Sequence, residues 1–326
     1  MLGVGLIVAA SAYVDLAAAQ SAAAKYSAAA KYPEKPIKII VPFPAGGSVD
    51  ILGRVFGQRM QENWGQPVIV ETRAGASTMI GTATAAKAEP DGYTLIIVVS
   101  NHATNPALRT NMPYDAFKDF ETISLMARTP VVLYAHPSFP ANNLKELVEV
   151  AKAKPGALNF ASAGVGSMTH LAGELLKIQA GIDMTHIIYR GGTPASLNDL
   201  VAGQIPMQFA TVAQALPQYR AGQLKALGVT SAARYGSIPE IPTFKEQGFD
   251  LVVTEWYGLL APAGTPKPII AKLNTEIRRI MALPNMGERL SAIELGSSTP
   301  EELSDFIRGE TDRWGTLITQ LGLKAE

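Results

Sequence analysis

Short apolar runs rich in β-branched residues alternate with amphipathic stretches along the chain from Pro36 onward. Between the first two runs, Leu52, Phe56 and Met60 recur at the spacing of one helix face. Alternating strands and helices are typical of α/β folds with mostly parallel sheets, so we expect that fold class. The predicted strands cover residues 37–41, 68–71, 94–99, 159–161, 186–189, 206–209 and 224–230.

Two longer stretches, 122–140 and 251–266, interrupt this alternation because each has the pattern of extended chain that ends in Pro-rich turns. Two interpretations are open from the pattern alone: both stretches are ordinary core strands, or both cross between two lobes. The second interpretation predicts a first lobe from residues 33–131 and 254–326, and a second lobe from residues 132–253. Such a double crossing suits a cleft that closes by a hinge.

The N-terminus has the pattern of an export signal. Residues 2–13 are apolar, and the small residues 17–19 follow where a signal peptidase would cut. We therefore expect a signal peptide at residues 1–19 and a linker at residues 20–32. The alternative is a disordered Ala-rich leader. No later stretch approaches the roughly 20 apolar residues of a transmembrane helix, so we expect a soluble mature protein.

Charge and composition exclude several function classes. The chain has 326 residues with 28 Lys plus Arg and 28 Asp plus Glu, so its net charge is zero and no broad basic field exists to hold nucleic acid. Cys is absent, which excludes disulfides and thiolate metal sites. His170 and Glu174 have helical spacing, but such a pair is more often a solvated helix face than a metal site. We expect no metal, no cofactor and no catalytic residues.

A Gly-rich turn follows the first predicted strand, in the sequence "VPFPAGGSVD". Gly46 and Gly47 allow an unusual backbone, and the helix that follows directs free N–H groups and its positive dipole end at the turn. The turn therefore predicts an anion site, although a purely structural turn is the alternative. Ser48 is not a catalytic nucleophile of the hydrolase type, because Asp50 stands where that motif requires Gly. We expect Asp50 to point aside or to contact a water or a ligand donor.

A second strand–turn–helix segment, "NFASAGVGSMTHLAGELL", repeats this arrangement in the middle of the chain. Gly164 and Gly166 form the turn, and Ser167 precedes the helix. The segment is not a dinucleotide-binding fingerprint, because Thr169 occupies the third glycine position. Two such turns on opposing lobes could share one anion across a cleft.

Further candidates follow other predicted strands, at the edge of a sheet where α/β folds bind ligands. Trp256 and Tyr257, inside the stretch 251–266, could instead form the floor of a cleft. Each has an alternative interpretation: loop capping for the hydroxyl and amide groups, an ion pair for the arginine, and core packing for the tryptophan. These candidates are Ala76, Ser77, Thr78, Ser100, Asn101, Arg190 and Trp256.

Several motifs occur together and in order between residues 32 and 266: "IVPFPAGGSVDILGR", "VIVETRAGASTMIG", "PDGYTLIIV", "LNFASAGVGSMTHLAGELL", "YRGGTPASLNDLVAGQI" and "WYGLLAPAGTP". With them, the chain resembles the periplasmic solute receptors of tripartite tricarboxylate transporters, often called Bug-type receptors. The resemblance implies an α/β, two-lobed periplasmic-binding-protein fold of the Venus flytrap type II, with a hinge of two crossing strands.

The resemblance also implies that backbone groups of the two Gly turns hold a carboxylate between the lobes. The residues carried over are Phe43, Pro44, Ala45, Gly46, Gly47, Ser48 and Asp50 in the first turn, and Ala163, Gly164, Val165, Gly166, Ser167 and His170 in the second. The chain departs from the family at residues 75–78, where two glycines are replaced by Ser77 and Thr78. It also departs at Thr211 and its neighbours, where relatives often have Asn or Asp. The less polar surface at Thr211 and its neighbours leaves room for an aliphatic or aromatic ligand body.

The expected function is that of a monomeric periplasmic receptor. It would capture a dicarboxylate or aromatic acid and deliver it, unchanged, to the membrane permease subunits of a tripartite tricarboxylate transporter. Two alternatives are open. One is an enzyme that acts on a carboxylate on a similar two-lobed scaffold, and the other is a ligand sensor for a signalling partner.

Overall fold

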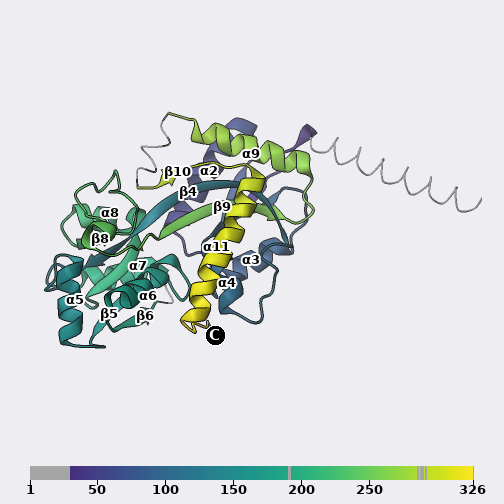
Figure 1. Cartoon of the computed structure of the whole chain (residues 1–326). Coiled ribbons are helices and arrows are strands. Elements are labelled where there is room, and N and C mark those ends of the chain that lie inside the picture. The colour runs from purple at the N-terminus through teal and green to yellow at the C-terminus, as the bar shows by residue number, and fades with distance from the viewer. Residues whose placement is uncertain (1–29, 190–191, 285, 287–289, 291, 326) are drawn as a thin grey trace, which may run out of the picture.

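The computed structural model describes residues 30–189, 192–284, 286, 290 and 292–325. The expected signal peptide, and all but the last three residues of the expected linker, lie outside them. Two lobes share two long strands that cross from one to the other (Figure 1). Within the described ranges, no helix is both long and apolar enough to cross a membrane.

The first lobe is built on β2 (Val68–Thr72), β1 (Ile37–Val41) and β3 (Thr94–Val99), which are parallel to one another. β9 (Thr254–Pro262) pairs antiparallel with β3 and with β4 (Phe120–Ala135). The short β10 (Glu294–Leu295) pairs with β4. The second lobe continues the sheet in the order β4-β7-β5-β6 through β7 (Met207–Thr211), β5 (Leu158–Ser162) and β6 (Met184–Ile188), while β8 (Lys225–Val229) also pairs with β4.

β4 is the clearest evidence for the hinge. Its first part pairs with β9 as far as Pro130, and from Val131 onward it pairs with β7 and β8 instead. The returning chain changes lobe in the same region, because Val253 lies in an apolar cluster of the second lobe and Tyr257 in one of the first. The two-lobed fold with two crossing strands is therefore confirmed. The lobe boundaries given above stay predictions.

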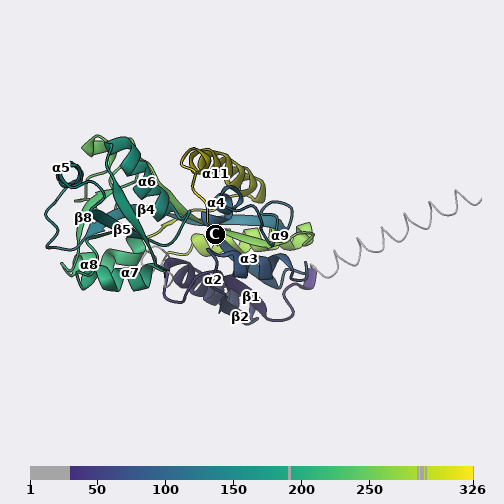
Figure 2. The ribbon, with the colours of Figure 1, turned by 90° about the horizontal axis from the view of Figure 1, so that it is seen from below.

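Helices cover both faces of the sheet, and Figure 2 shows the first lobe's layers from the side. The helices are α2 (Ser48–Trp64), α3 (Met79–Ala86), α4 (Asn101–Leu108), α5 (Leu144–Ala153), α6 (Met168–Ala180), α7 (Gly192–Val201), α8 (Val212–Arg220), the short η1 (Lys245–Gln247), α9 (Lys267–Met281) and α11 (Pro300–Gln320). Consecutive strand residues alternate between faces, so Ile39 lies in an apolar cluster with residues of α2 and α9, whereas Ile40 lies in a cluster with residues of α3, α4 and α11 on the other side.

Candidate functional site

A pocket with about 540 Å³ of unoccupied space, part of it open to solvent, lies between the lobes. The first lobe contributes Phe43, Pro44, Gly47, Ser48, Val49, Val99, Asn101, Glu255 and Tyr257. The second lobe contributes Ala163, Ser167, Thr169, Gly192, Thr193, Pro194, Thr211 and Gln214.

The first turn is held from behind by Asp50. The backbone N–H of Gly46 donates to Oδ2 of Asp50 at 3.0 Å, and Arg54 pairs with the same carboxylate at 3.0 Å. Asp50 therefore points aside and does not line the pocket. The first hydrogen bond of α2 runs from Ile51 N–H to Gly47 O. The N–H groups that precede it, including those of Ser48 and Val49, are thus outside the helix's own bonding pattern, beside the pocket.

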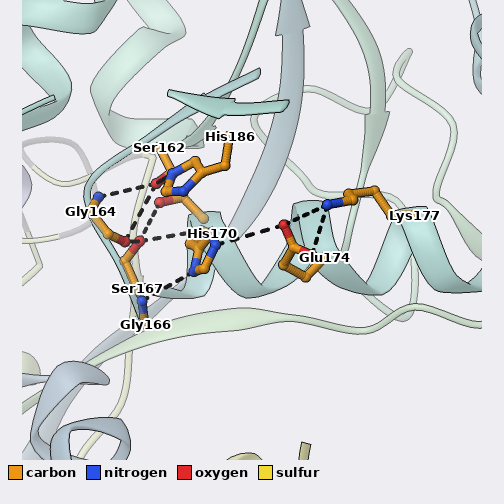
Figure 3. Close-up of polar contacts among 9 residues, drawn as sticks. Ser162, Gly164, Gly166, Ser167, His170, Glu174, Lys177 and His186 are labelled. Atoms are coloured by element: carbon orange, nitrogen blue, oxygen red, sulfur yellow. Dashed lines mark hydrogen bonds and ion pairs between the residues drawn. The ribbon is translucent and has the colours of Figure 1, made fainter. Parts of the chain in front are cut away.

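The second turn is stabilised by hydroxyl groups (Figure 3). Ser167 Oγ donates to Gly164 O at 2.7 Å and accepts from His170 N–H at 3.2 Å, which caps α6. Thr169 Oγ1 accepts from Ala163 N–H at 3.0 Å. Ala163, Ser167 and Thr169 line the pocket, whereas Gly164 bends the turn at a φ of +126° without lining it.

A pair of histidines lies behind this turn. The rings of His170 and His186 stack with centroids 4.1 Å apart, Gly166 N–H donates to His170 Nδ1 at 3.2 Å, and Ser162 Oγ lies 2.6 Å from His186 Nε2 (Figure 3). Burial lowers the pKa of His170 to about 3 and that of His186 to about 4. Both rings are therefore neutral at pH 7. His170 supports the turn from behind and does not line the pocket.

Five helices begin at the pocket. Ser48 and Val49 start α2, Asn101 starts α4, Ser167 caps α6, Gly192 starts α7, and Thr211 caps α8; each of these residues lines the pocket. Each helix start carries partial positive charge and N–H groups without intrahelical partners. This arrangement suits an anion, although the described lining contains no Lys or Arg side chain.

Of the residues expected at the site, eight line the pocket: Phe43, Pro44, Gly47, Ser48, Asn101, Ala163, Ser167 and Thr211. Several others shape the two turns or lie behind the lining without taking part in it, namely Ala45, Gly46, Asp50, Ser100, Gly164, Val165, Gly166 and His170. Arg190 lies outside the described residues.

Three further expected site residues, which follow β2, are not brought to the pocket. Ala76, Ser77 and Thr78 all have left-handed φ values of +47°, +51° and +78°, and Asn105 Nδ2 donates to Ser77 O at 3.0 Å. These residues shape the entry to α3, outside the pocket lining.

The structure also does not bring Trp256 to the pocket. Trp256 is buried against Phe306 of α11, with ring centroids 5.4 Å apart. Its neighbours Glu255 and Tyr257 line the pocket instead, because adjacent residues of β9 point to opposite faces.

Glu255 is the main residue that the sequence interpretation missed. Its Oε1 accepts hydrogen bonds from Ser100 N–H at 3.0 Å and from Trp256 N–H at 3.2 Å. Burial raises the pKa of Glu255 to about 7, although these N–H groups and the Ser100 hydroxyl lower it in part. A lone carboxyl inside the apolar run "LVVTEWYGLLAP" was the available signal. The other missed lining residues are Val49, Val99, Thr169, Gly192, Thr193, Pro194 and Gln214.

Known proteins similar to this chain include ligand-bound structures. Protein BugT of Bordetella pertussis is 35% identical over 298 residues, which cover 90% of this chain and 91% of BugT. A Rhodopseudomonas palustris protein solved with adipate, Rpa4515, is 30% identical, with a TM-score of 0.86 over 90% of this chain and 99% of that one. MatC from the same organism, solved with bound malate, is 32% identical, with a TM-score of 0.81 over 88% and 100%.

Residues 52–323 match the family described as "Tripartite tricarboxylate transporter family receptor", which includes most of both lobes. The two-lobed fold and the pocket between the lobes agree with that match. The chain belongs to the tripartite tricarboxylate transporter receptor family and is a Bug-type solute-binding protein.

Proposed function

We propose that this protein captures a small carboxylate, either a dicarboxylate or an aromatic acid, in the pocket between its lobes. The main support for this proposal is that five helices, α2, α4, α6, α7 and α8, all begin at one pocket. Their N–H groups and hydroxyls can bind an anion without a cationic side chain. The relatives solved with adipate and with malate support a carboxylate as the ligand class.

We further propose that the ligand is released unchanged to the membrane permease subunits of a tripartite tricarboxylate transporter. Family membership supports this role, and it supports the periplasm as the place of capture. The described lining offers one carboxyl group, that of Glu255, and no nucleophile paired with a base. We propose that the receptor acts as a monomer, because each two-lobed chain forms its own pocket.

Thermal unfolding with matched ligand pairs tests the proposal. Succinate, adipate, malate, benzoate and terephthalate are each compared with the corresponding amide, and small-angle scattering reports compaction. A ligand whose free concentration is 100 times its Kd adds about 2.7 kcal/mol to the free energy of unfolding, which gives a clear rise in Tm. An acid that raises Tm and compacts the protein, while its amide does neither, is the expected result. Equal effects of acid and amide, or steady conversion of the acid to a product, would contradict the proposal.

A further inference from the structure

Glu255 places an acidic group in a pocket that suits anions. It lies at the start of β9, beside the hinge, and the residue is 9% exposed. Among the lining residues that the structure describes, it is the only carboxylic acid. A bound carboxylate would therefore share the pocket with a second carboxyl group, that of the buried Glu255. Two carboxylates in such a place repel each other strongly, and one of them is expected to hold a proton.

The charges around Glu255 do not relieve this repulsion. α11 adds negative charge, because Glu310 raises the pKa of Glu255 further; Glu310 itself lies 3.7 Å from Arg313 and accepts from Trp314 Nε1. From β4, the residue opposite Glu255 is the uncharged Thr129. Ser100 and Asn101, at the start of α4, are also uncharged. The Tyr257 hydroxyl stays neutral, since burial holds its pKa far above the usual range.

The hydrogen bonds show which oxygen can carry the proton. Oε1 of Glu255 accepts from two backbone N–H groups, those of Ser100 and Trp256. An oxygen that already accepts two N–H groups acts as the carbonyl oxygen of a neutral acid, so the O–H belongs on Oε2. A neutral Glu255 is then a hydrogen-bond donor toward its ligand, as the helix starts are.

We propose that Glu255 determines the ligand class by binding as a neutral carboxylic acid, whose Oε2–H donates a hydrogen bond to the ligand's carboxylate. The inference rests on the proposed function above. It has two consequences. Capture of an anionic acid takes up a proton from solution, which ends on Glu255. Acids without an ammonium group are preferred to zwitterionic amino acids, because the neutral Glu255 offers no charge to an amine.

Isothermal titration calorimetry of the wild-type protein with adipate tests the proton uptake. Titrations in buffers that differ in ionisation enthalpy measure the number of protons taken up per ligand. We expect this number to rise toward about one between pH 6.5 and pH 9, and the affinity to fall about tenfold per pH unit above the pKa of Glu255. This measurement needs no variant and is unaffected by any folding defect.

Glu255→Gln supplies the matched variant. The amide is always neutral and still offers an N–H donor, so adipate should bind it with an affinity that does not change over this pH range and without proton uptake. The control is Glu149→Gln on the exposed face of α5, far from the pocket, which should keep the wild-type proton uptake.

Three results separate the possible failures. Adipate binding without proton uptake would overturn the role of Glu255 and leave the proposed function intact. A second contrary result is that aspartate binds more tightly than succinate and that Glu255→Gln removes this preference. This result would show an ionised Glu255 that pairs with an amine, and it would also overturn the inference. Failure of adipate, succinate, malate, benzoate and terephthalate to bind at any pH would overturn both proposals.

Discussion

In the first turn, two adjacent glycines serve different purposes. Gly46 has a left-handed φ of +84°, which residues with a side chain rarely adopt. Gly47 has an ordinary extended backbone with φ −80° and ψ 170°, but it lines the pocket. The sequence predicted an unusual backbone for both glycines, and the structure has a left-handed conformation at Gly46 but not at Gly47. At Gly47, the missing side chain leaves space for a ligand.

Substitution of these two glycines should separate folding from binding. Gly47→Val fits the backbone and places its side chain at the pocket, so we expect lost carboxylate binding and little change in the free energy of unfolding. Gly46→Val forces valine into a left-handed conformation and should cost about 1 to 3 kcal/mol of stability. Calorimetry with adipate and urea unfolding measure the two effects. A Gly47→Val protein that binds adipate as tightly as the wild type would remove this turn from the site.

At the scale of elements, α6 shows how uncharged groups hold a helix start in place. Ser167 caps the helix, and the stacked pair of His170 and His186 fills the space behind the turn. Glu174, one turn further along α6, pairs with Lys177 at 3.0 Å (Figure 3). Neutral rings leave the positive end of α6 as the main electrostatic feature of this wall.

This histidine pair should make the protein less stable in acid. The pKa values of both rings lie below the usual 6.5 in the folded protein, so the unfolded chain binds more protons between about pH 6.5 and pH 3. The stabilisation is complete above about pH 6.5 and is lost as the pH falls. Each pKa unit corresponds to about 1.4 kcal/mol, so we expect each ring to contribute a loss on the order of 3 kcal/mol as the pH falls from 6.5 to 4.

Urea unfolding at a series of pH values measures this effect. His170→Gln should show a smaller loss of stability between pH 6.5 and pH 4 than the wild type does. His136→Gln, which alters a more exposed histidine at the end of β4, is the control and should keep the wild-type pH dependence. Equal pH dependence in all three proteins would mean that carboxylates cause the acid destabilisation.

The start of α11 provides a second element-scale prediction. Thr299 Oγ1 accepts from Glu302 N–H at 3.1 Å, and Glu302 Oε2 accepts from Thr299 N–H at 2.8 Å, which is a capping box. Thr299→Ala should lower the free energy of unfolding by about 1 kcal/mol without changing ligand affinity. Thr316→Ala, at an exposed position inside the same helix, should be neutral or slightly stabilising. Equal destabilisation by both substitutions would argue against the capping role.

The elements could be predicted from the sequence more completely than the site. β3 was predicted from Thr94 to Val99, as the structure has it, because a run of buried β-branched residues between turns has few other solutions. The face that each residue of β9 presents depends on its pairing with β3 and β4, which a single sequence does not reveal. That is why Trp256 was expected at the pocket while Glu255 was missed.

At the scale of the whole molecule, the lobes are joined by β4 and β9 and contact each other across the pocket. Thr104 Oγ1 of α4 donates to Gly166 O of the second turn at 2.8 Å. Ser48 Oγ and Thr211 Oγ1 face each other across the pocket at 3.5 Å. Contacts of this kind exist only while the lobes are close together. They favour the closed form, and a ligand that binds the closed form benefits from them.

Thr104→Val should therefore weaken binding from outside the pocket. Thr104 is fully buried but does not line the pocket, so the substitution removes the hydrogen bond to Gly166 without touching the ligand. A hydrogen bond contributes about 0.5 to 1.5 kcal/mol, so we expect about 2- to 10-fold weaker adipate binding. Thr82→Val is the matched control, because Thr82 Oγ1 donates to Thr78 O at 3.0 Å within the first lobe. It should lower stability and leave affinity unchanged. If both variants bind adipate equally well, the bond between Thr104 and Gly166 does not contribute to closure.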